Sequence, residues 1–440
     1  PYGFLPLIQA DDDDSNIFAG IKGAAYGWNV DLSLGWGKNS IDYNTIQSVN
    51  RSYGIFSKTA FYDGGYSYDQ STIGLDVSRG FDVGLAEPLN VAGGLQYREE
   101  NYEIHPGEPA SYNDGGQGGG LGAQGFGGFQ PSNAADADRH NWAAYVDLEG
   151  KFTQNFSYGL AGRYEDYSDF GDQATGKLSL RYDITPQVAI RGAISNGFKA
   201  PALQQQYFSY TATNLNTTTV GGVPVTSLIQ SGKFRVNDPV AISLGARPLE
   251  PETSMNYSVG AVYRFGSFQM TVDAYQIDIE DRITLSENLG SGATAADAQV
   301  RTILAPYGVS AAQFFLNGVD TTTKGVDIVA HYRMPTESYG RFDFTVAANF
   351  NDTKVTRVPT TAATTAIGAS STFLFNRANR LSYEFGQPEQ KIIASVDWFK
   401  DGLGLTARAT NYDSVLLPNN VATLDQNTGT ATLVDLAVRY

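Results

Sequence analysis

The chain contains no cysteine, and this absence excludes several kinds of site at once. Disulfides, thiolate zinc sites, iron–sulfur clusters and cysteine nucleophiles all require the missing thiol. Three histidines, His105, His140 and His331, leave little material for a histidine-based metal or acid–base site. Basic residues are scarce too: 46 Asp and Glu outnumber 30 Lys and Arg, for a net charge of −16. We expect no nucleic-acid partner, because phosphate contacts need Lys and Arg.

Long hydrophobic runs are also missing. A transmembrane helix needs about 20 mostly apolar residues in a row. Two long charge-free stretches, 200–232 and 302–319, are rich in Gln, Thr and Asn or interrupted by Pro and Gly. The abundant residues are Gly (48), Tyr (26) and Phe (24), whereas charged residues make up only 17% of the chain. An ordinary soluble domain carries about 25% charged residues, so the composition does not describe a typical cytosolic enzyme.

The repeating unit of the sequence is an alternating strand. In residues 341–351, one face carries Phe342, Phe344, Val346, Ala348 and Phe350, and the intervening residues are mostly polar. Such a period of two is typical of a strand with one apolar and one polar face. The pattern predicts 15 strands, at about 17–24, 29–48, 71–84, 91–104, 140–152, 156–168, 175–184, 187–200, 252–265, 268–284, 319–334, 341–354, 381–400, 403–412 and 430–440.

The lengths of the connections favour a membrane barrel. Short connections, such as 154–155 and 266–267, alternate with long polar ones. The long connections lie at about 101–139, 205–250, 285–318, 355–380 and 412–430. Outer-membrane barrels have short periplasmic turns and long extracellular loops. The alternative is a secreted all-β protein such as a propeller, but no repeat of 40–50 residues accompanies the strands. We therefore predict an all-β fold, a transmembrane antiparallel β-barrel.

Four segments resemble the barrel of TonB-dependent outer-membrane receptors. Residues 195–203 (SNGFKAPAL) are similar to the family segment S-x-G-F-R/K-A-P-x-L, and residues 249–260 to L-x-P-E-x-S-x-N-x-E-x-G. In the second segment Ser258 stands where the family usually has Glu. Residues 275–283 resemble Y-x-I-x-I-x-D-x-I, and residues 317–327 resemble N-x-G-x-x-x-x-x-G-V-E/D. The matched family-motif residues in the first two segments include Gly197, Phe198, Ala200, Pro201, Glu250, Pro251 and Glu252.

The resemblance implies a 22-stranded barrel plugged by a separate domain. Fifteen strands fit only part of such a barrel, so we expect residues 1–440 to be a partial barrel domain. The plug and the TonB box would then lie outside this chain, which opens at Pro1 rather than Met. The implied activity is energy-dependent uptake of a scarce, bulky nutrient across the bacterial outer membrane. The nutrient would be a ferric siderophore, an oligosaccharide or a similar complex. The implied partners are outer-membrane lipid and, through the plug, the TonB energising complex.

The sequence offers little covalent chemistry. Residues 120–125 match G-x-G-x-x-G but lack the flanking strand and helix of a dinucleotide site. We interpret the acidic run 11–14 as a solvated loop, because calcium loops space their oxygen ligands. We expect no catalytic residue, no metal and no cofactor. Two alternatives to active transport stay open: a passive porin or scaffold barrel, and an outer-membrane enzyme that uses His105 or His140.

Ligand recognition is the remaining role for individual side chains. Aromatic residues in polar loops suit stacking on a sugar or a catecholate, or they pack loop against loop. The candidate substrate-binding residues are Tyr112, Phe126, Phe129, Tyr207, Phe208 and Tyr210. Three arginines are predicted to face the lumen: Arg163, Arg181 and Arg191. They either attract an anionic substrate, or pair with neighbouring Asp residues or contact the plug.

Overall fold

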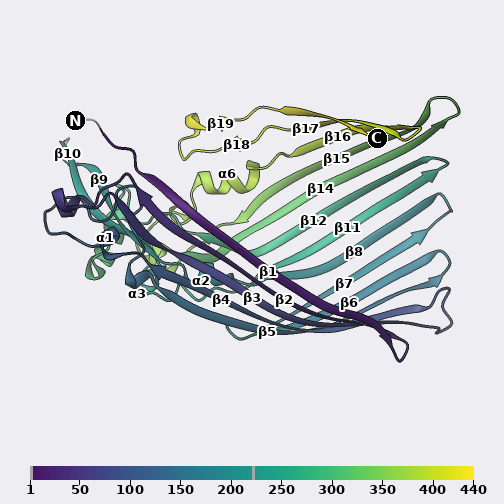
Figure 1. Ribbon diagram of the computed structural model, residues 1–440, viewed down its shortest axis with the longest axis horizontal. Helices are drawn as coiled ribbons and strands as arrows, with labels where there is room; N and C mark the ends of the chain where they lie inside the picture. The colour runs from purple at the N-terminus through teal and green to yellow at the C-terminus, as the bar shows by residue number, and fades with distance from the viewer. Residues whose placement is uncertain (1–2, 221–222) are drawn as a thin grey trace.

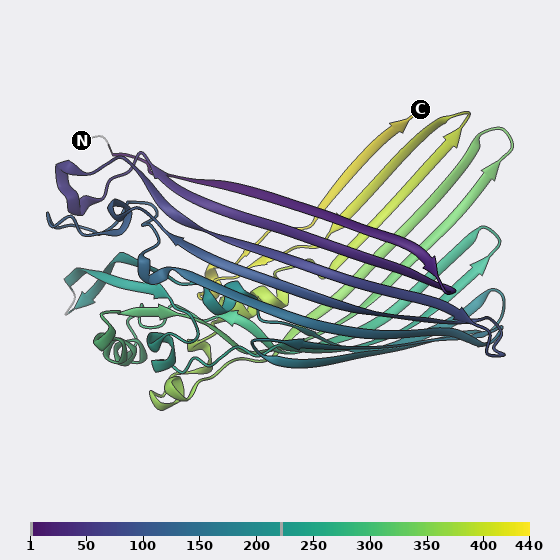
Figure 2. The same ribbon diagram turned by 60° about the horizontal axis from the view of Figure 1, so that its bottom comes forward.

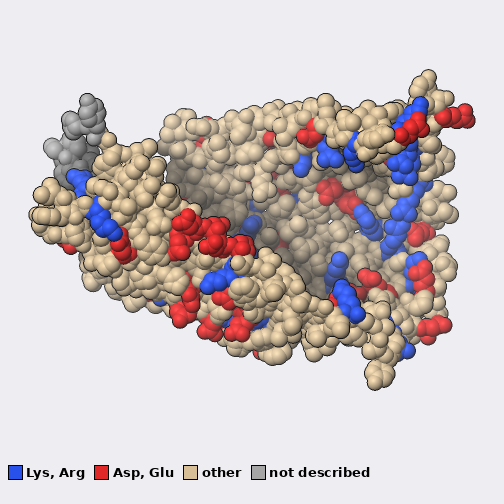
Figure 3. All heavy atoms as spheres, viewed as in Figure 1, with Lys and Arg blue, Asp and Glu red and all other residues tan. Residues whose placement is uncertain are grey.

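The computed structural model describes residues 3–220 and 223–440 and contains one large antiparallel sheet. Fifteen strands follow one another in the order β1-β2-β3-β4-β5-β6-β7-β8-β11-β12-β14-β15-β16-β17-β20. The sheet is curved (Figures 1 and 2), and the space-filling view shows a hollow in the molecule (Figure 3). Its strands are β1 Leu7–Ala25, β2 Trp28–Ile46, β3 Ala60–Phe81, β4 Leu89–Pro106, β5 Ala135–Thr153, β6 Phe156–Tyr167, β7 Gly171–Asp183, β8 Val188–Lys199, β11 Glu252–Phe265, β12 Phe268–Leu285, β14 Phe315–Thr336, β15 Gly340–Arg357, β16 Gln390–Lys400, β17 Leu403–Tyr412 and β20 Ala431–Arg439.

The predicted number of barrel strands is confirmed, but three strand starts are wrong by nine residues or more, among them that of the strand predicted at 71–84, which begins at Ala60. The first strand begins at Leu7 rather than near residue 17, so the acidic run 11–14 lies in β1 and not in a loop. Pairing with β2 gives this polar stretch its hydrogen bonds, and Asn39 also donates to Asp12 at 2.7 Å. The strand expected at 381–400 begins only at Gln390, because residues Arg377–Phe385 form helix α6.

The two faces of the sheet differ as the alternation predicts. Residues opposite each other in the ladder share a face, so outward positions can be followed from strand to strand. On β3 the outward, solvent-exposed residues Ile73 and Leu75 mark an apolar band, the surface that a barrel presents to lipid. Nearer the chain's long connections, outward positions become charged, as at Asp69 and at Asp138 of β5. The strands therefore extend beyond the apolar band.

The long connections gather at one end of the sheet and the short turns at the other (Figure 1). The long ones span 47–59, 107–134, 200–251, 286–314, 358–389 and 413–430. They contain η1 Arg51–Phe56, α1 Pro109–Tyr112, η2 Pro131–Asn133, α2 Leu203–Tyr207, β9 Tyr210–Val220, β10 Val223–Lys233, α3 Pro239–Ser243, α4 Ala295–Leu304, η3 Ala305–Tyr307, β13 Ala311–Gln313, α5 Ala362–Ala366, η4 Ser371–Phe373, β18 Leu416–Leu417, η5 Ala422–Leu424 and β19 Gln426–Asn427.

Two features of this end differ from the expected strict alternation. A further long connection, 47–59, was not predicted, and the connection 168–170 at the same end is short.

The long connections pack against one another as well as facing water. One apolar cluster joins the 200–251 and 286–314 connections, with Leu244, Val300 and Phe314 among its fully buried members. In the described part of the chain, no helix is long and apolar enough to cross a membrane.

Candidate ligand-binding site

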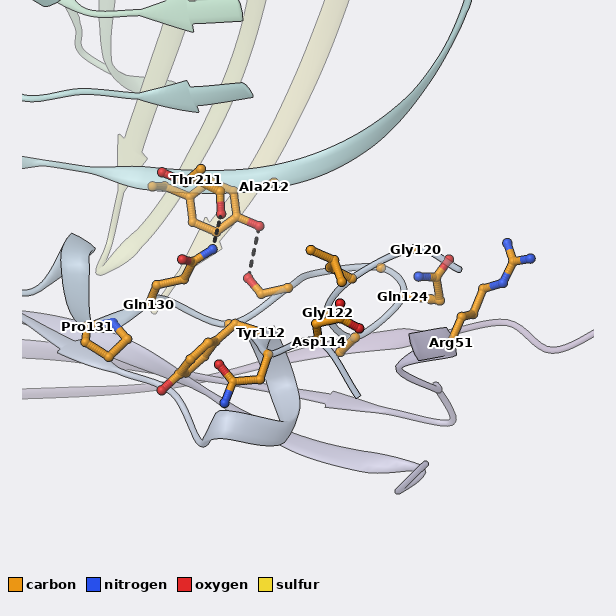
Figure 4. Close-up of a pocket in the computed structure, with 17 residues that line it drawn as sticks. Arg51, Tyr112, Asp114, Gly120, Gly122, Gln124, Gln130, Pro131, Thr211 and Ala212 are labelled. Atoms are coloured by element: carbon orange, nitrogen blue, oxygen red, sulfur yellow. Dashed lines mark hydrogen bonds between the residues drawn. The ribbon is translucent and has the colours of Figure 1, made fainter. Parts of the chain in front are cut away.

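A cavity of about 570 Å³ lies at the long-connection end of the sheet. The Gly-rich part of connection 107–134 forms most of its wall, and the start of β9 closes one side (Figure 4). Arg51 and Gln124 lie at one end of the cavity, and Tyr112 and Gln130 lie at the other. Its lining is Arg51, Tyr112, Asn113, Asp114, Gly120, Leu121, Gly122, Ala123, Gln124, Gly125, Gly127, Gly128, Gln130, Pro131, Tyr210, Thr211 and Ala212.

A buried asparagine fastens the Gly-rich connection to its neighbour. Asn50, in connection 47–59, has no exposed surface. Its Nδ2 donates to the carbonyl oxygens of Ala110 and Asn113, both at 2.9 Å, and its Oδ1 accepts from Ser52 Oγ at 2.6 Å. Ser52 Oγ in turn accepts from the backbone N–H of Gly115 at 2.9 Å. A segment rich in Gly is flexible alone, so these bonds give the cavity a defined wall.

A buried acidic residue, Asp63, also holds the Gly-rich connection 107–134 in place. Asp63, near the start of β3, is fully buried, and its Oδ2 accepts from Thr45 Oγ1 at 2.5 Å. Its backbone carbonyl accepts from the N–H of Phe129 at 2.8 Å. Asp63 lies ten residues before Ile73, about 33 Å along the strand at ~3.3 Å per residue, and thus outside the apolar band. Burial raises the pKa of Asp63 to about 7.

The structure brings most of the predicted aromatic residues into one cluster. The rings of Phe126 and Tyr210 are stacked, with centroids 5.1 Å apart and an interplanar angle of 6°. Phe129 meets Tyr210 edge to face at 5.6 Å and Phe208 at 6.2 Å, and Tyr207 packs on the same cluster. Phe129 is only 2% exposed. Its ring packs loop on loop, the second of the two interpretations that the sequence left open.

Two of the predicted aromatics lie on the cavity itself. Tyr112 and Tyr210 line it. The lining does not include the other four, Phe126, Phe129, Tyr207 and Phe208, which belong to the aromatic cluster. Burial raises the pKa of Tyr210 to about 12, so its hydroxyl stays protonated and donates to the Gly127 carbonyl at 3.0 Å. Tyr112 has no such restraint among the described residues, and its side chain is free to meet a ligand.

The three predicted arginines lie on the concave face and are already paired. Arg163 Nε donates to Glu165 at 2.7 Å, and Arg181 Nη2 donates to Asp183 at 2.7 Å. Arg191 Nη2 donates to Asp273 at 2.5 Å. Positive and negative side chains are accordingly mixed within the hollow (Figure 3). The placement of all three matches the pairing interpretation more closely than the attraction of an anionic substrate.

The first motif fixes the base of connection 200–251. Phe198 packs edge to face on Tyr167 with centroids 6.0 Å apart. The carbonyl oxygen of Pro201 accepts from Arg139 Nη1 at 2.6 Å, and Arg139 forms a buried ion pair with Glu100, also at 2.6 Å. This network holds the connection where it leaves β8.

The second motif, residues 249–260, forms hydrogen bonds with residues near the ends of β8, β12 and β14. Glu252 is 7% exposed and accepts from Lys199 Nζ at 2.9 Å and from the backbone N–H of Ile283 at 3.1 Å. The backbone N–H of Glu250 donates to Asn317 Oδ1 at 2.9 Å. The family-motif residues are thus structural, and none lines the cavity. Of the remaining motif residues, Gly197 lies in β8, Ala200 follows the last residue of β8, and Pro251 precedes the first residue of β11.

Sequence reasoning missed several residues that build the cavity. Arg51, Gln124 and Gln130 line it, and Asn50 and Asp63 hold its wall. One signal was readable, because Asp63 precedes two glycines within a strand, a pattern that indicates a β-bulge. The bulge exists: Gly64 has φ +84°, and the register with β2 shifts there.

Among the described residues, no group of three or more His, Cys, Asp or Glu side chains is placed to hold a metal ion. Comparison with known proteins gives a consistent family. A family model described as TonB dependent receptor-like, beta-barrel, matches residues 2–440. The iron-regulated outer membrane virulence protein of Vibrio cholerae is 22% identical over 144 residues, which are 32% of this chain and 18% of that protein.

Other relatives are similar over shorter segments or in fold. The vitamin B12 transporter BtuB of Vibrio cholerae is 31% identical over 70 residues, 16% of this chain and 11% of that protein. The siderophore receptor PirA from Acinetobacter baumannii has a TM-score of 0.62 at 13% identity, covering 98% of this chain and 56% of that one. A mutant of the ferric enterobactin receptor PfeA from Pseudomonas aeruginosa has a TM-score of 0.63 at 14% identity, covering 97% of this chain and 54% of that one. The chain thus spans about half the length of these solved receptors.

Proposed function

Because the chain belongs to the family of TonB-dependent receptor β-barrels of the bacterial outer membrane, we propose that it forms the wall and the ligand-binding mouth of an active transporter. The cargo is a scarce, bulky nutrient of the ferric siderophore type. Similar solved proteins include receptors for siderophores and for ferric enterobactin. Energy reaches the cargo through TonB and a plug domain outside this chain.

One observation carries the proposal: the cavity lies where cargo would arrive. It opens among the long connections, which face the exterior in outer-membrane barrels. The curved sheet below supplies a hollow along which cargo released from the mouth would pass (Figure 3). The volume of the cavity, about 570 Å³, falls in the usual range of ligand pockets, ~300–1,000 Å³. Its wall is fixed by Asn50, so little order must be gained on binding.

The lining suits a ligand with flat rings and many polar atoms. Tyr112 offers a ring for stacking. Gln124 and Gln130 offer amides, which both donate and accept hydrogen bonds. Arg51 and Asp114 add one charge of each sign. The cavity thus provides aromatic, polar and charged contacts for recognition.

Binding of ferric siderophore to cells tests the proposal. Cells carrying the full receptor are chilled to stop transport and incubated with 55Fe bound to the siderophores that the source bacterium secretes. Loss of ring stacking in Tyr112→Ala should weaken binding about tenfold, equivalent to ~1.4 kcal/mol. Tyr339→Ala, which removes a 72% exposed ring at the short-turn end, is the matched control and should bind as the wild type does. Equal affinity of all three proteins would refute the assignment of the cavity.

A further inference from the structure

An apolar hollow on the convex face lies far from the ligand-binding cavity. The hollow measures about 500 Å³ and spans strands β7, β8 and β11, which are neighbours in the sheet (Figure 1). Gly192 of β8 forms its floor. Leu180 of β7 and Val259 of β11 lie directly opposite Gly192 in the ladder on either side. Ile190 and Ile194 flank it along β8 and point to the same face.

The space above Gly192 is empty. A Cβ atom added there would meet only the Ser258 carbonyl oxygen, at 3.4 Å, which is an ordinary contact distance. The surrounding side chains are branched and face outward, with Val259 exposed to 64% and Ile190 to 46%. A glycine among four large apolar residues therefore leaves a pit between them. Its walls lack the dispersion contacts that close packing would give them.

Position along the strand places the pit in one leaflet. Gly192 follows the first residue of β8, Val188, by four positions, about 13 Å at ~3.3 Å per residue. The short turn before Val188 lies on the periplasmic side of such a barrel. Because the strands of such barrels tilt by about 35–45°, this distance corresponds to a height of ~9–11 Å. That is less than half of an apolar band ~25 Å tall, so the pit opens into its periplasmic half. The lipid there is phospholipid, whereas lipopolysaccharide occupies the outer half.

We propose that this hollow binds one acyl chain of a periplasmic-leaflet phospholipid. Continuity with the lipid-facing band identifies the occupant, since hydrocarbon is the medium that the pit meets. The methylene groups of a chain restore the missing dispersion contacts, and the outward-facing lining is apolar except for the hydroxyl of Tyr182. The site is independent of the transport proposal, because its residues lie on the opposite face from the hollow that cargo would cross.

Native mass spectrometry of protein extracted from outer membranes tests the site. Gly192→Leu fills the pit with its own side chain, and the backbone there is not left-handed, so the strand is preserved. The wild type should retain one phospholipid more per protein than Gly192→Leu under identical detergent washing. Ala144→Leu adds the same side chain at an exposed outward position of β5 and should retain lipid as the wild type does.

Three outcomes would overturn the proposal. The first is equal phospholipid retention by Gly192→Leu and the wild type. The second is an equal loss from Ala144→Leu, which would mean that any bulky outward residue displaces lipid. The third is selective loss of lipopolysaccharide instead of phospholipid from Gly192→Leu, which would contradict the leaflet assignment.

Discussion

Arg191 and Asp273 form a two-point ion pair across a strand that separates them. Arg191 Nε donates to Asp273 Oδ1 at 2.8 Å and Nη2 donates to Oδ2 at 2.5 Å, although β11 lies between β8 and β12. The residue of β11 beneath the pair is Gly260, which is opposite both partners in the ladder. The absent side chain at Gly260 is what lets the two charged groups meet.

Adding one methyl group at Gly260 should break this pair. A Cβ there would lie 2.0 Å from Asp273 Oδ1 and 3.0 Å from the carbonyl oxygen of Val272. We expect Gly260→Ala to destabilise the barrel by about 1–3 kcal/mol, the usual cost of overpacking. The midpoint of denaturant unfolding in detergent measures the loss. Gly162→Ala, whose Cβ would have no neighbour closer than 4.0 Å, is the control. An unchanged midpoint for Gly260→Ala would show that the pair tolerates displacement.

Removing the Asn50 side chain should loosen the cavity wall. Asn50→Ala removes the donor to the Ala110 carbonyl and leaves the Asn113 carbonyl only the 3.4 Å bond from Ser52 Oγ. The expected cost is about 0.5–1.5 kcal/mol for each hydrogen bond lost. Hydrogen exchange in residues 107–134 should accelerate, while exchange in the central strands stays slow. Gln117→Ala removes an exposed side chain from the same connection and should leave exchange unchanged. Wild-type exchange rates in Asn50→Ala would disprove the role of Asn50 in fixing the cavity wall.

The order of the same connection should depend on pH through Asp63. Its pKa is raised to about 7 from an ordinary value of 3.8, with burial as the leading cause. Between these values the folded state holds a proton that the unfolded state has lost. Stability is therefore full below pH 4 and falls as the pH rises through about 7, by at most ~4 kcal/mol.

Hydrogen exchange corrected for its intrinsic pH dependence measures this effect. Protection of residues 107–134 in the wild type should be lower at pH 8 than at pH 5. Asp63→Asn keeps a polar group of the same size that does not ionise, so its protection should be the same at both values. A matching fall in protection in Asp63→Asn would assign the effect to another group.

The sequence was most informative where a strand has one apolar face. The limits of β11, Glu252–Phe265, agree with the prediction because alternation continues up to the short turn. Alternation failed for residues 7–16 of β1, because residues 11–16, in the part that extends past the apolar band, are polar on both faces. It misled at 381–385, where Leu381 and Tyr383 are spaced as in a strand but belong to α6. Asn376 as N-cap and Gly386 at the C-terminus were the overlooked helix signals.

The candidate site was predictable only in part. Of the aromatic residues predicted in polar loops, Tyr112 and Tyr210 line the cavity. Asn50 carried no signal, because its partners Ala110 and Asn113 lie about 60 residues away and are reached through backbone atoms. Contacts of that kind depend on how the connections fold over one another, which no local pattern reports.

Energy dependence of uptake tests the central claim most directly. Cells that express the full receptor, and matched cells lacking TonB, are supplied with 55Fe on the secreted siderophores, and accumulation is followed at growth temperature. The transporter account predicts that both strains bind iron at the surface but only the TonB-containing cells accumulate it. Equal accumulation in both strains would contradict active transport and favour a passive pore.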